Sequence, residues 1–390
     1  MTEGALSKIK VIDLTAARAG PACVRVLSDF GADVIQVLRP GGAEIDVAFP
    51  RFDRENLHRN KRSVAINLQT DEGRAVLLRL VEDADVFVEN FRADVKYRLG
   101  IDYESIAKVN PKIVYGSISG FGQDGPYGPW AGVDQIAQGM GGLMSITGQP
   151  GTGPWRAGIA ICDLAAGLHL AHGIMAALIE RQTSGKGQWI TTSLLEGIIS
   201  LLDFQATRWL IGGEVAEQAG NAHPTGFLTD LYETSDGYVN VGAHGNGRRY
   251  VDFVKTLELD ELSAVDDYKK TGFSKEEVDA KVRARLKQKT SQEWTLALNK
   301  AGVPCGPVNT IDKVFDDPQV QHLQMAQEVN SPRFGPLKVV RSPVTFSRTP
   351  ASLRASAPLP GEQTNGVLSQ HGFSESEIAA LTEKGVIANV

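Results

Sequence analysis

The sequence predicts an α/β fold in which a large domain with a Rossmann-like parallel sheet is joined to a smaller α+β domain. Three observations support this prediction. The chain opens with a strand, a helix and a second strand, and the same alternation continues to about residue 118. From about residue 222 the pattern changes to a hairpin followed by charged amphipathic helices. Alternating strands and helices pack as a parallel sheet covered on both faces.

The opening unit is the clearest part of the pattern. The apolar run Ile9–Leu14 reads as a buried strand, and helical spacing follows from Pro21, a residue suited to the first helical turn. A second apolar run, Val34–Leu38, ends at Arg39. Two strands joined through a helix imply a right-handed parallel βαβ unit.

The rest of the chain fills out two domains. A Gly- and Pro-rich region between residues 120 and 158 is too long for a tight connection, so a functional loop is expected there. The C-terminal stretch shows few strand signals before a last helix. Further strands are expected at 63–68, 86–89, 113–118 and 189–192, helices at 71–82, 163–181 and 375–383, and a hairpin at 231–241. We assign 1–200 and 325–390 to the large domain, 222–320 to the small domain, and 201–221 and 321–330 to linkers.

Composition excludes several classes of function. The 390 residues carry a net charge of −6 without a basic stripe, so neither nucleic acid nor a membrane surface is an expected partner. The N-terminus lacks a signal-peptide layout, and we expect no membrane span, because no apolar run approaches the roughly 18 residues that one needs. Three scattered cysteines favour reduced thiols. A cytoplasmic location is expected.

A dinucleotide site of the usual kind is not predicted. The loop after the first strand, Ala16-Ala17-Arg18-Ala19-Gly20-Pro21, lacks the Gly-x-Gly-x-x-Gly pattern, and Arg39 stands where NAD would need a carboxylate. Arg39 together with Lys61 and Arg62 could instead meet a phosphorylated adenosine carrier. Solvated surface charge is an equally weighted alternative for these cations.

Other single motifs are weak. The segment Gly116–Gly120 has Ile118 where a serine nucleophile would stand, and His169 with His172 lacks a third metal ligand at a recognisable spacing, so no metal is expected. Asp163 precedes a strongly apolar helix. Its local interpretation is a helix N-cap.

The ordered set of motifs is more specific than any one of them. The chain resembles the family III CoA-transferases of the CaiB/BaiF type, which include formyl-CoA transferase and carnitine CoA-transferase and share a fold with α-methylacyl-CoA racemase. The resemblance rests on these segments: Ala19-Gly20-Pro21, Gly31-Ala32-Asp33-Val34-Ile35, Asn60-Lys61-Arg62-Ser63, Val88-Glu89-Asn90-Phe91, Gly120-Phe121-Gly122, Asp163 with Gly167-Leu168, Gly185-Lys186-Gly187-Gln188, Val303-Pro304-Cys305-Gly306-Pro307-Val308 and Gly361-Glu362.

The resemblance implies that Asp163 attacks an acyl-CoA thioester to form a mixed anhydride and then an aspartyl-CoA thioester, from which an acceptor acid takes CoA. Asp134 stands where formyl-CoA transferase has an active-site glutamate, and Arg18 completes the expected catalytic set. The expected CoA-binding residues are Ala17, Ala19, Arg39, Lys61, Asn90, Phe91 and Arg98. No permanently bound cofactor is implied, because CoA enters as part of the substrate, and the family implies an interlocked homodimer.

Two positions, Arg18 and Val133, bear on substrate and reaction. Arg18 replaces a glutamine of formyl-CoA transferase and could pair with the second carboxylate of a dicarboxylic substrate, such as succinyl-CoA, with Arg156 and His223 nearby. Val133 stands where the racemases have a histidine base, which disfavours an epimerase. A non-catalytic acyl-CoA-binding subunit is the third alternative, and the intact Asp163 motif argues against it.

Overall fold

The computed structural model describes residues 4–41 and 51–389, and the chain divides into two units. Unit 1 comprises residues 1–143, 156–212 and 319–390, and unit 2 comprises residues 144–155 and 213–318. This division differs from the sequence-based boundaries in several segments. Residues 144–155 cluster with unit 2, the expected linker 201–221 is divided between unit 1 (201–212) and unit 2 (213–221), and residues 319–330 cluster with unit 1.

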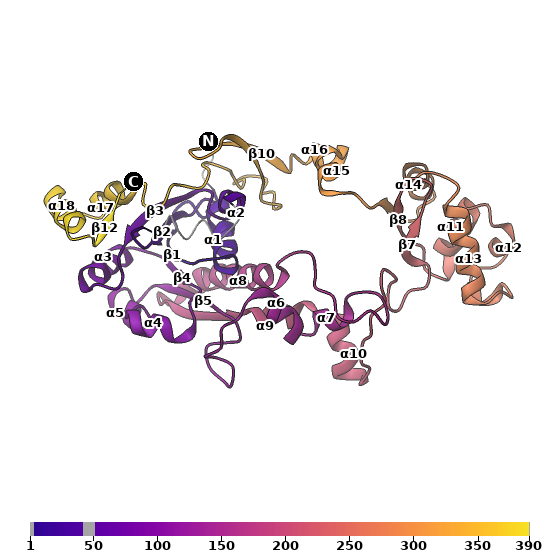
Figure 1. Ribbon diagram of the computed structural model, residues 1–390, viewed down its shortest axis with the longest axis horizontal. Helices are drawn as coiled ribbons and strands as arrows, with labels where there is room; N and C mark the ends of the chain where they lie inside the picture. The colour runs from indigo at the N-terminus through magenta and orange to yellow at the C-terminus, as the bar shows by residue number, and fades with distance from the viewer. Residues whose placement is uncertain (1–3, 42–50, 390) are drawn as a thin grey trace. The chain divides into compact units, whose positions relative to one another are not determined.

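A seven-stranded sheet forms the centre of unit 1, in the order β12-β3-β2-β1-β4-β5-β6 (Figure 1). All neighbouring strands pair in parallel except β12, which pairs antiparallel with β3. The strands are β1 (Lys10–Leu14), β2 (Asp33–Leu38), β3 (Lys61–Ile66), β4 (Val86–Glu89), β5 (Val114–Ser119), β6 (Gln188–Ser193) and β12 (Ile387–Ala388). This is the doubly wound order, with its switch point between β1 and β4. The predicted Rossmann-like parallel sheet is therefore confirmed.

Helices cover both faces of this sheet. The helices of unit 1 include α1 (Ala19–Asp29), α2 (Arg51–Leu57), α3 (Asp71–Val81), α4 (Ala93–Leu99), α5 (Tyr103–Val109), α6 (Asp134–Met140), α8 (Ile161–Ser184), α9 (Leu194–Leu201), α10 (Phe204–Gly212), α17 (Thr364–Gln370) and α18 (Glu375–Glu383). Short helices α7 (Leu143–Ile146) and α16 (Pro318–His322) lie where the chain passes between the units.

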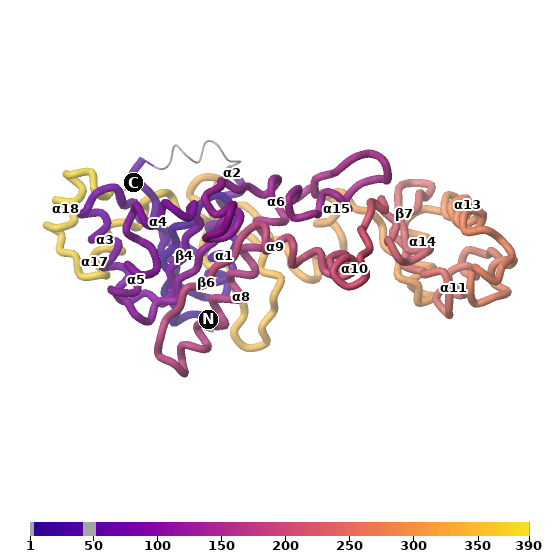
Figure 2. Tube along the Cα trace, turned by 90° about the horizontal axis from the view of Figure 1, so that it is seen from below, coloured from indigo at the N-terminus to yellow at the C-terminus, as the bar shows by residue number. Residues whose placement is uncertain are grey.

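Successive residues of β1 enter two separate cores, as the pleat of a strand requires. Val11 packs in the core that contains α1 and α8. Ile12 packs in the core that contains α3, α5, α17 and α18. Both views show α17 and α18 beside α3, although nearly 300 residues separate them in the sequence (Figures 1 and 2). The C-terminal helices thus complete the first domain.

Helix α8 corrects one sequence expectation. It is 24 residues long and apolar enough, by length and composition, to cross a membrane. Half of its most apolar window is buried in unit 1, where Leu170 and Ile174 pack against the sheet and α1. Its apolar composition is explained by this position in the core.

The C-terminal stretch contains a hairpin that the sequence did not predict. Strands β10 (Ala326–Ser331) and β11 (Gly335–Val340) pair antiparallel, and β10 occupies part of the expected linker 321–330. Most hairpin side chains are exposed or half-buried, so the strands lack the apolar run or clean alternation that would have indicated them.

Unit 2 is a small α+β unit around its own core, as predicted. Its antiparallel sheet has the order β7-β8-β9, and Trp294, Tyr250 and Phe253 are fully buried behind it. The elements are β7 (Thr229–Glu233), β8 (Tyr238–Gly242), β9 (Cys305–Pro307), α11 (Gly247–Thr256), α12 (Asp260–Ser263), the 3-10 helix η2 (Tyr268–Lys270), α13 (Lys275–Leu286), α14 (Ser291–Lys300) and α15 (Ile311–Asp316).

Candidate active site

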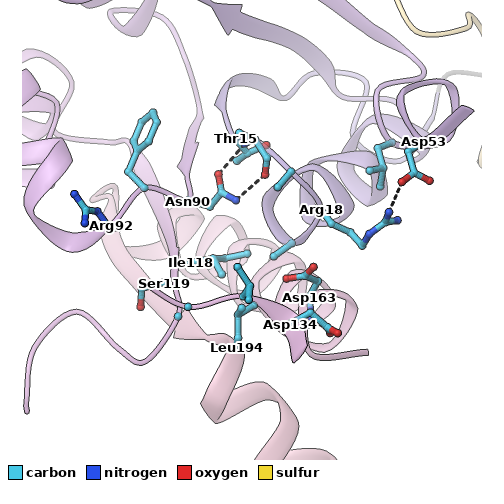
Figure 3. A pocket seen from close by; sticks show the side chains of 18 of the residues that line it. Thr15, Arg18, Asp53, Asn90, Arg92, Ile118, Ser119, Asp134, Asp163 and Leu194 are labelled. Atoms are coloured by element: carbon cyan, nitrogen blue, oxygen red, sulfur yellow. Dashed lines mark hydrogen bonds and ion pairs between the residues drawn. The ribbon is translucent and has the colours of Figure 1, made fainter. Parts of the chain in front are cut away.

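A cavity of about 660 Å³ lies in unit 1 where the strands of the sheet end (Figure 3). Its wall includes Thr15 after β1, Arg39 after β2, Asn90 after β4 and Gly120 after β5. Ligands of doubly wound folds bind at this edge, next to the switch point between β1 and β4. The fold therefore places the cavity where a ligand is expected.

The loop between β1 and α1 forms one wall of the cavity and is held by side-chain hydrogen bonds. The amide of Asn90 accepts from the Ala16 N–H and donates to the Ala16 carbonyl, both at 2.8 Å. Ala17 adopts a left-handed conformation with φ of 57°. Asn90 thus fixes the loop backbone that carries Arg18, so a structural role adds to its expected contact with CoA.

A buried ion pair anchors the same loop on the side that faces the core. Asp13 accepts from the Thr15 N–H at 2.9 Å and from Lys61 Nζ at 2.8 Å, and the side chains of Asp13 and Lys61 are fully buried. Among the described residues that line the cavity, Lys61 is absent. The structure corrects the expectation that Lys61 lines the CoA site, because its ammonium group points into the core toward Asp13.

A close contact between α1 and α8 brings the nucleophile candidate to this loop. A Cβ atom on Gly167 would lie 2.5 Å from the Ala19 carbonyl oxygen, so only glycine allows the two helices to approach so closely. Asp163 lies four residues earlier, on the same face of α8. The contact at Gly167 therefore turns Asp163 toward the start of α1, and Asp163 lines the cavity.

Asp163 is not the N-cap of α8, as the local pattern had suggested. The helix begins at Ile161 with Ala160 as N-cap, so Asp163 lies in the first turn. The capping carboxylate is Asp134, which accepts from the Cys162 N–H at 2.9 Å and from the Asp163 N–H at 3.5 Å. A second helix, α6, thus supplies the cap and places two carboxylates side by side.

The environment of Asp163 suits a carboxylate that must be reactive at neutral pH. Burial and the neighbouring negative charge of Asp134 raise the pKa of Asp163 to about 6, while Arg18 opposes the increase. The helix dipole was expected to favour the ionised form. Burial outweighs that effect, yet Asp163 remains mainly ionised above about pH 6, with its negative charge poorly solvated.

The wall of the cavity is rich in cations. Of the described residues that line it, six are arginines and three are aspartates. They are Arg18, Arg39, Arg54, Arg92, Arg156 and Arg333, and Asp53, Asp134 and Asp163. This excess of positive charge attracts polyanions such as CoA and carboxylic acids. Arg156 lies 3.7 Å from Asp134 and so balances part of the charge beside Asp163.

The other predicted residues divide into two groups. Ala17, Ala19, Arg39, Asn90 and Phe91 line the cavity with the three catalytic candidates. Arg98 does not belong to the described lining: its side chain is 68% exposed on α4 and pairs with Asp94 at 3.8 Å. Arg98 and Asp94 are four residues apart on the surface of α4, so an ion pair within the helix accounts for the position of the Arg98 side chain. His223 lies in unit 2.

Several lining residues were missed by sequence reasoning. Asp53, Arg54 and His58 come from α2 and the residue after it, and Arg333 comes from the turn of the unpredicted hairpin. The motif Asn60-Lys61-Arg62-Ser63 was singled out from the sequence instead, but it follows α2 and does not belong to the described lining of the cavity. Only a correct prediction of α2 and of β10 and β11 could have signalled these residues.

Two other chemistries have little support in the described part of the chain. No group of three or more His, Cys, Asp or Glu side chains there is arranged to hold a metal ion. Burial and Asp134 raise the pKa of the Cys162 thiol to about 12, so Cys162 stays protonated and is a poor nucleophile.

Comparisons with known proteins agree with this geometry. The family model of CoA-transferase family III matches residues 6–364. A succinate–glutarate CoA-transferase from Agrobacterium fabrum is 38% identical over 94% of this chain and 95% of its own length. A succinyl-CoA:mesaconate CoA-transferase from Haloarcula marismortui is 35% identical over 95% of this chain and 97% of its own. A crystal structure of a CAIB/BAIF family protein from Brucella suis superposes with a TM-score of 0.85 at 32% identity, over 95% of this chain and all of that one.

Proposed function

Because this chain belongs to CoA-transferase family III, we propose that it moves CoA from succinyl-CoA or another dicarboxyl-CoA to a dicarboxylic acid, with Asp163 as the covalent carrier. The chain is a CoA-transferase by its family and by relatives that share its whole length. Those relatives are named for succinate, glutarate and mesaconate, all short dicarboxylic acids. The observation that carries the proposal is the poorly solvated Asp163 carboxylate beside Arg18 in a cation-lined cavity.

In the proposed mechanism a carboxylate oxygen of Asp163 attacks the thioester carbonyl of the donor. The C–S bond breaks, and a mixed anhydride and CoA thiolate form. The thiolate then attacks the Asp163 carbonyl, which releases the donor acid as a carboxylate and leaves an aspartyl-CoA thioester. The acceptor carboxylate repeats the two steps in reverse, so acyl activation is conserved without ATP.

The residues around Asp163 support this sequence of steps. Partial burial leaves the carboxylate poorly solvated, which increases its reactivity toward a thioester. Asp134 holds the first turn of α8 in place through the Cys162 N–H. Arg18 is positioned by the rigid loop to bind the second carboxylate of the substrate, a role that a guanidinium performs with paired hydrogen bonds. Val133 lines the cavity where the related racemases have a histidine, which favours transfer over epimerisation.

The proposed enzyme has no resident cofactor, because CoA arrives with the substrate, and it works in the cytoplasm as a homodimer. Exposed apolar side chains on α10 support an assembly: Trp209, Leu210 and Ile211 are between 57% and 83% exposed. Light scattering should then give twice the chain mass of 42.0 kDa. The chain mass alone would contradict the homodimer.

A CoA-exchange assay tests the proposed function. Wild-type protein with succinyl-CoA and a panel of acids should form new acyl-CoA thioesters, with short dicarboxylic acids as the preferred acceptors. Asp163→Ala should abolish exchange with every acid, while a folded control such as Asp33→Asn, at the start of β2, should retain it. Exchange that survives in Asp163→Ala would refute the proposed role of this residue.

A further inference from the structure

An ion pair joins the β1–α1 loop to α2 across the wall of the cavity. Arg18 contacts Asp53 through its guanidinium group, and both residues line the cavity. Their side chains are 29% and 30% exposed. Figure 3 shows the Arg18 side chain reaching toward Asp53, with Asp163 and Asp134 below Arg18 in this view. The pair therefore lies at the site itself.

Asp53 is not needed to hold the backbone at Arg18. Asn90 and Asp13 already fix the loop through Ala16 and Thr15. The pair instead gives a charged partner to a guanidinium group that is partly removed from water. Arg18 also lowers the pKa of Asp163, so its charge acts directly on the carboxylate that would react.

We propose that Asp53 is an internal substitute for the distal carboxylate of the substrate and that, by competing for Arg18, it limits the affinity of the cavity for dicarboxylic acids. In the structure Asp53 pairs with the guanidinium group of Arg18. A dicarboxylic acid whose reacting carboxylate meets Asp163 brings its second carboxylate to Arg18 and displaces Asp53. One ion pair replaces another, so the cost of freeing Arg18 is largely offset. This inference rests on the proposed function.

A monocarboxylic acid cannot displace Asp53 from Arg18 in this way. A monocarboxylic acid offers an apolar end, which leaves Arg18 paired with Asp53 and gains nothing from the cation. Because a dicarboxylic acid must displace Asp53 from Arg18, Asp53 weakens the binding of dicarboxylic acids. It also competes with unrelated anions that could bind to Arg18.

Asp53→Asn tests the proposal, because it keeps the size of the side chain and removes its charge. With succinyl-CoA as donor, the KM for a dicarboxylic acceptor such as glutarate should fall about two- to fivefold, the range for a partly exposed ion pair. The kcat should stay within about twofold. The KM for butyrate should not change. If butyrate gives no turnover, its inhibition constant against glutarate serves as the same readout.

A matched pair serves as the control. Arg62 and Asp33 form an ion pair of similar exposure, 28% and 44%. The pair lies near the starts of β2 and β3, whereas the cavity lies where the strands end. Asp33→Asn should leave every KM unchanged. In an Arg18→Gln background, Asp53→Asn should have no further effect on the KM for glutarate, because the group it competes for is gone.

Several outcomes would overturn the inference. A higher KM for glutarate in Asp53→Asn, or an equal change for glutarate and butyrate, would show that Asp53 only orients Arg18 or supports α2. An unchanged KM for both acids would show that Asp53 does not compete with substrate. Failure of the wild-type protein to exchange CoA with any acid would instead refute the proposed function, so the two failures are distinguishable.

Discussion

The unfavourable burial of Asp163 should make the protein less stable than a variant without that charge. The pKa of this carboxyl is raised from 3.8 to about 6, so the native state binds the proton more tightly than the unfolded chain does. Wild-type stability therefore falls as the pH rises from about 4 to about 6. This pKa difference corresponds to a loss of about 3 kcal/mol in the free energy of unfolding. Because solvent reaches part of the side chain, we expect Asp163→Asn to gain about 1 to 3 kcal/mol at about pH 8.

Urea unfolding at one protein concentration measures this gain, since association would otherwise shift the midpoint. At about pH 5 the stability gain of Asp163→Asn over the wild type should be roughly half of its value at about pH 8, because Asp163 is then largely protonated in the native wild type. Asp71→Asn is a matched control: Asp71 also lies in the first turn of a helix but is 93% exposed. Its neutralisation should cost a few tenths of a kcal/mol, through the helix dipole. A less stable Asp163→Asn at about pH 8 would refute the reasoning.

Three further predictions follow from the contacts around Asp163. Asp134→Asn should lower the pKa of Asp163 by removing a like charge, so the acidic limb of the kcat/KM profile should move to lower pH; an unchanged limb would contradict the coupling. Lys61→Met should cost about 3 to 5 kcal/mol in urea unfolding, because Asp13 is left buried and unpaired. Gly167→Ala should lower both stability, by roughly 1 to 3 kcal/mol, and kcat in steady-state assays, because the methyl group forces α8 away from the loop at Arg18. A variant with full activity would contradict that role.

The sequence predicted most of the first sheet well because strands such as β1, β2 and β4 are largely buried and consist mainly of apolar residues. Strand β4 and helix α18 have the bounds that were expected. The hairpin of β10 and β11 was not predicted, since its residues are mostly exposed or half-buried and give little apolar signal. The composition of α8 was also misjudged, because a core helix and a membrane span share the same apolar pattern.

For the site, the ordered motifs identified Asp163, Asp134 and the loop at Arg18, and all of them line one cavity. Sequence order could not reveal which side chains point inward. Lys61 begins β3 and turns into the core, whereas Asp53 reaches the cavity from α2. Those directions depend on the register between β2 and β3 and on the packing of α2, which no local pattern encodes.

The covalent role of Asp163 is the central claim, and trapping the intermediate tests it most directly. Wild-type protein is incubated with succinyl-CoA, treated with hydroxylamine or borohydride, digested and analysed by mass spectrometry. We predict a hydroxamate or an alcohol at Asp163, dependent on succinyl-CoA, because both reagents attack an activated aspartyl carbonyl. An unmodified Asp163 in protein that still exchanges CoA, or a modification at another carboxylate such as Asp134, would contradict the account.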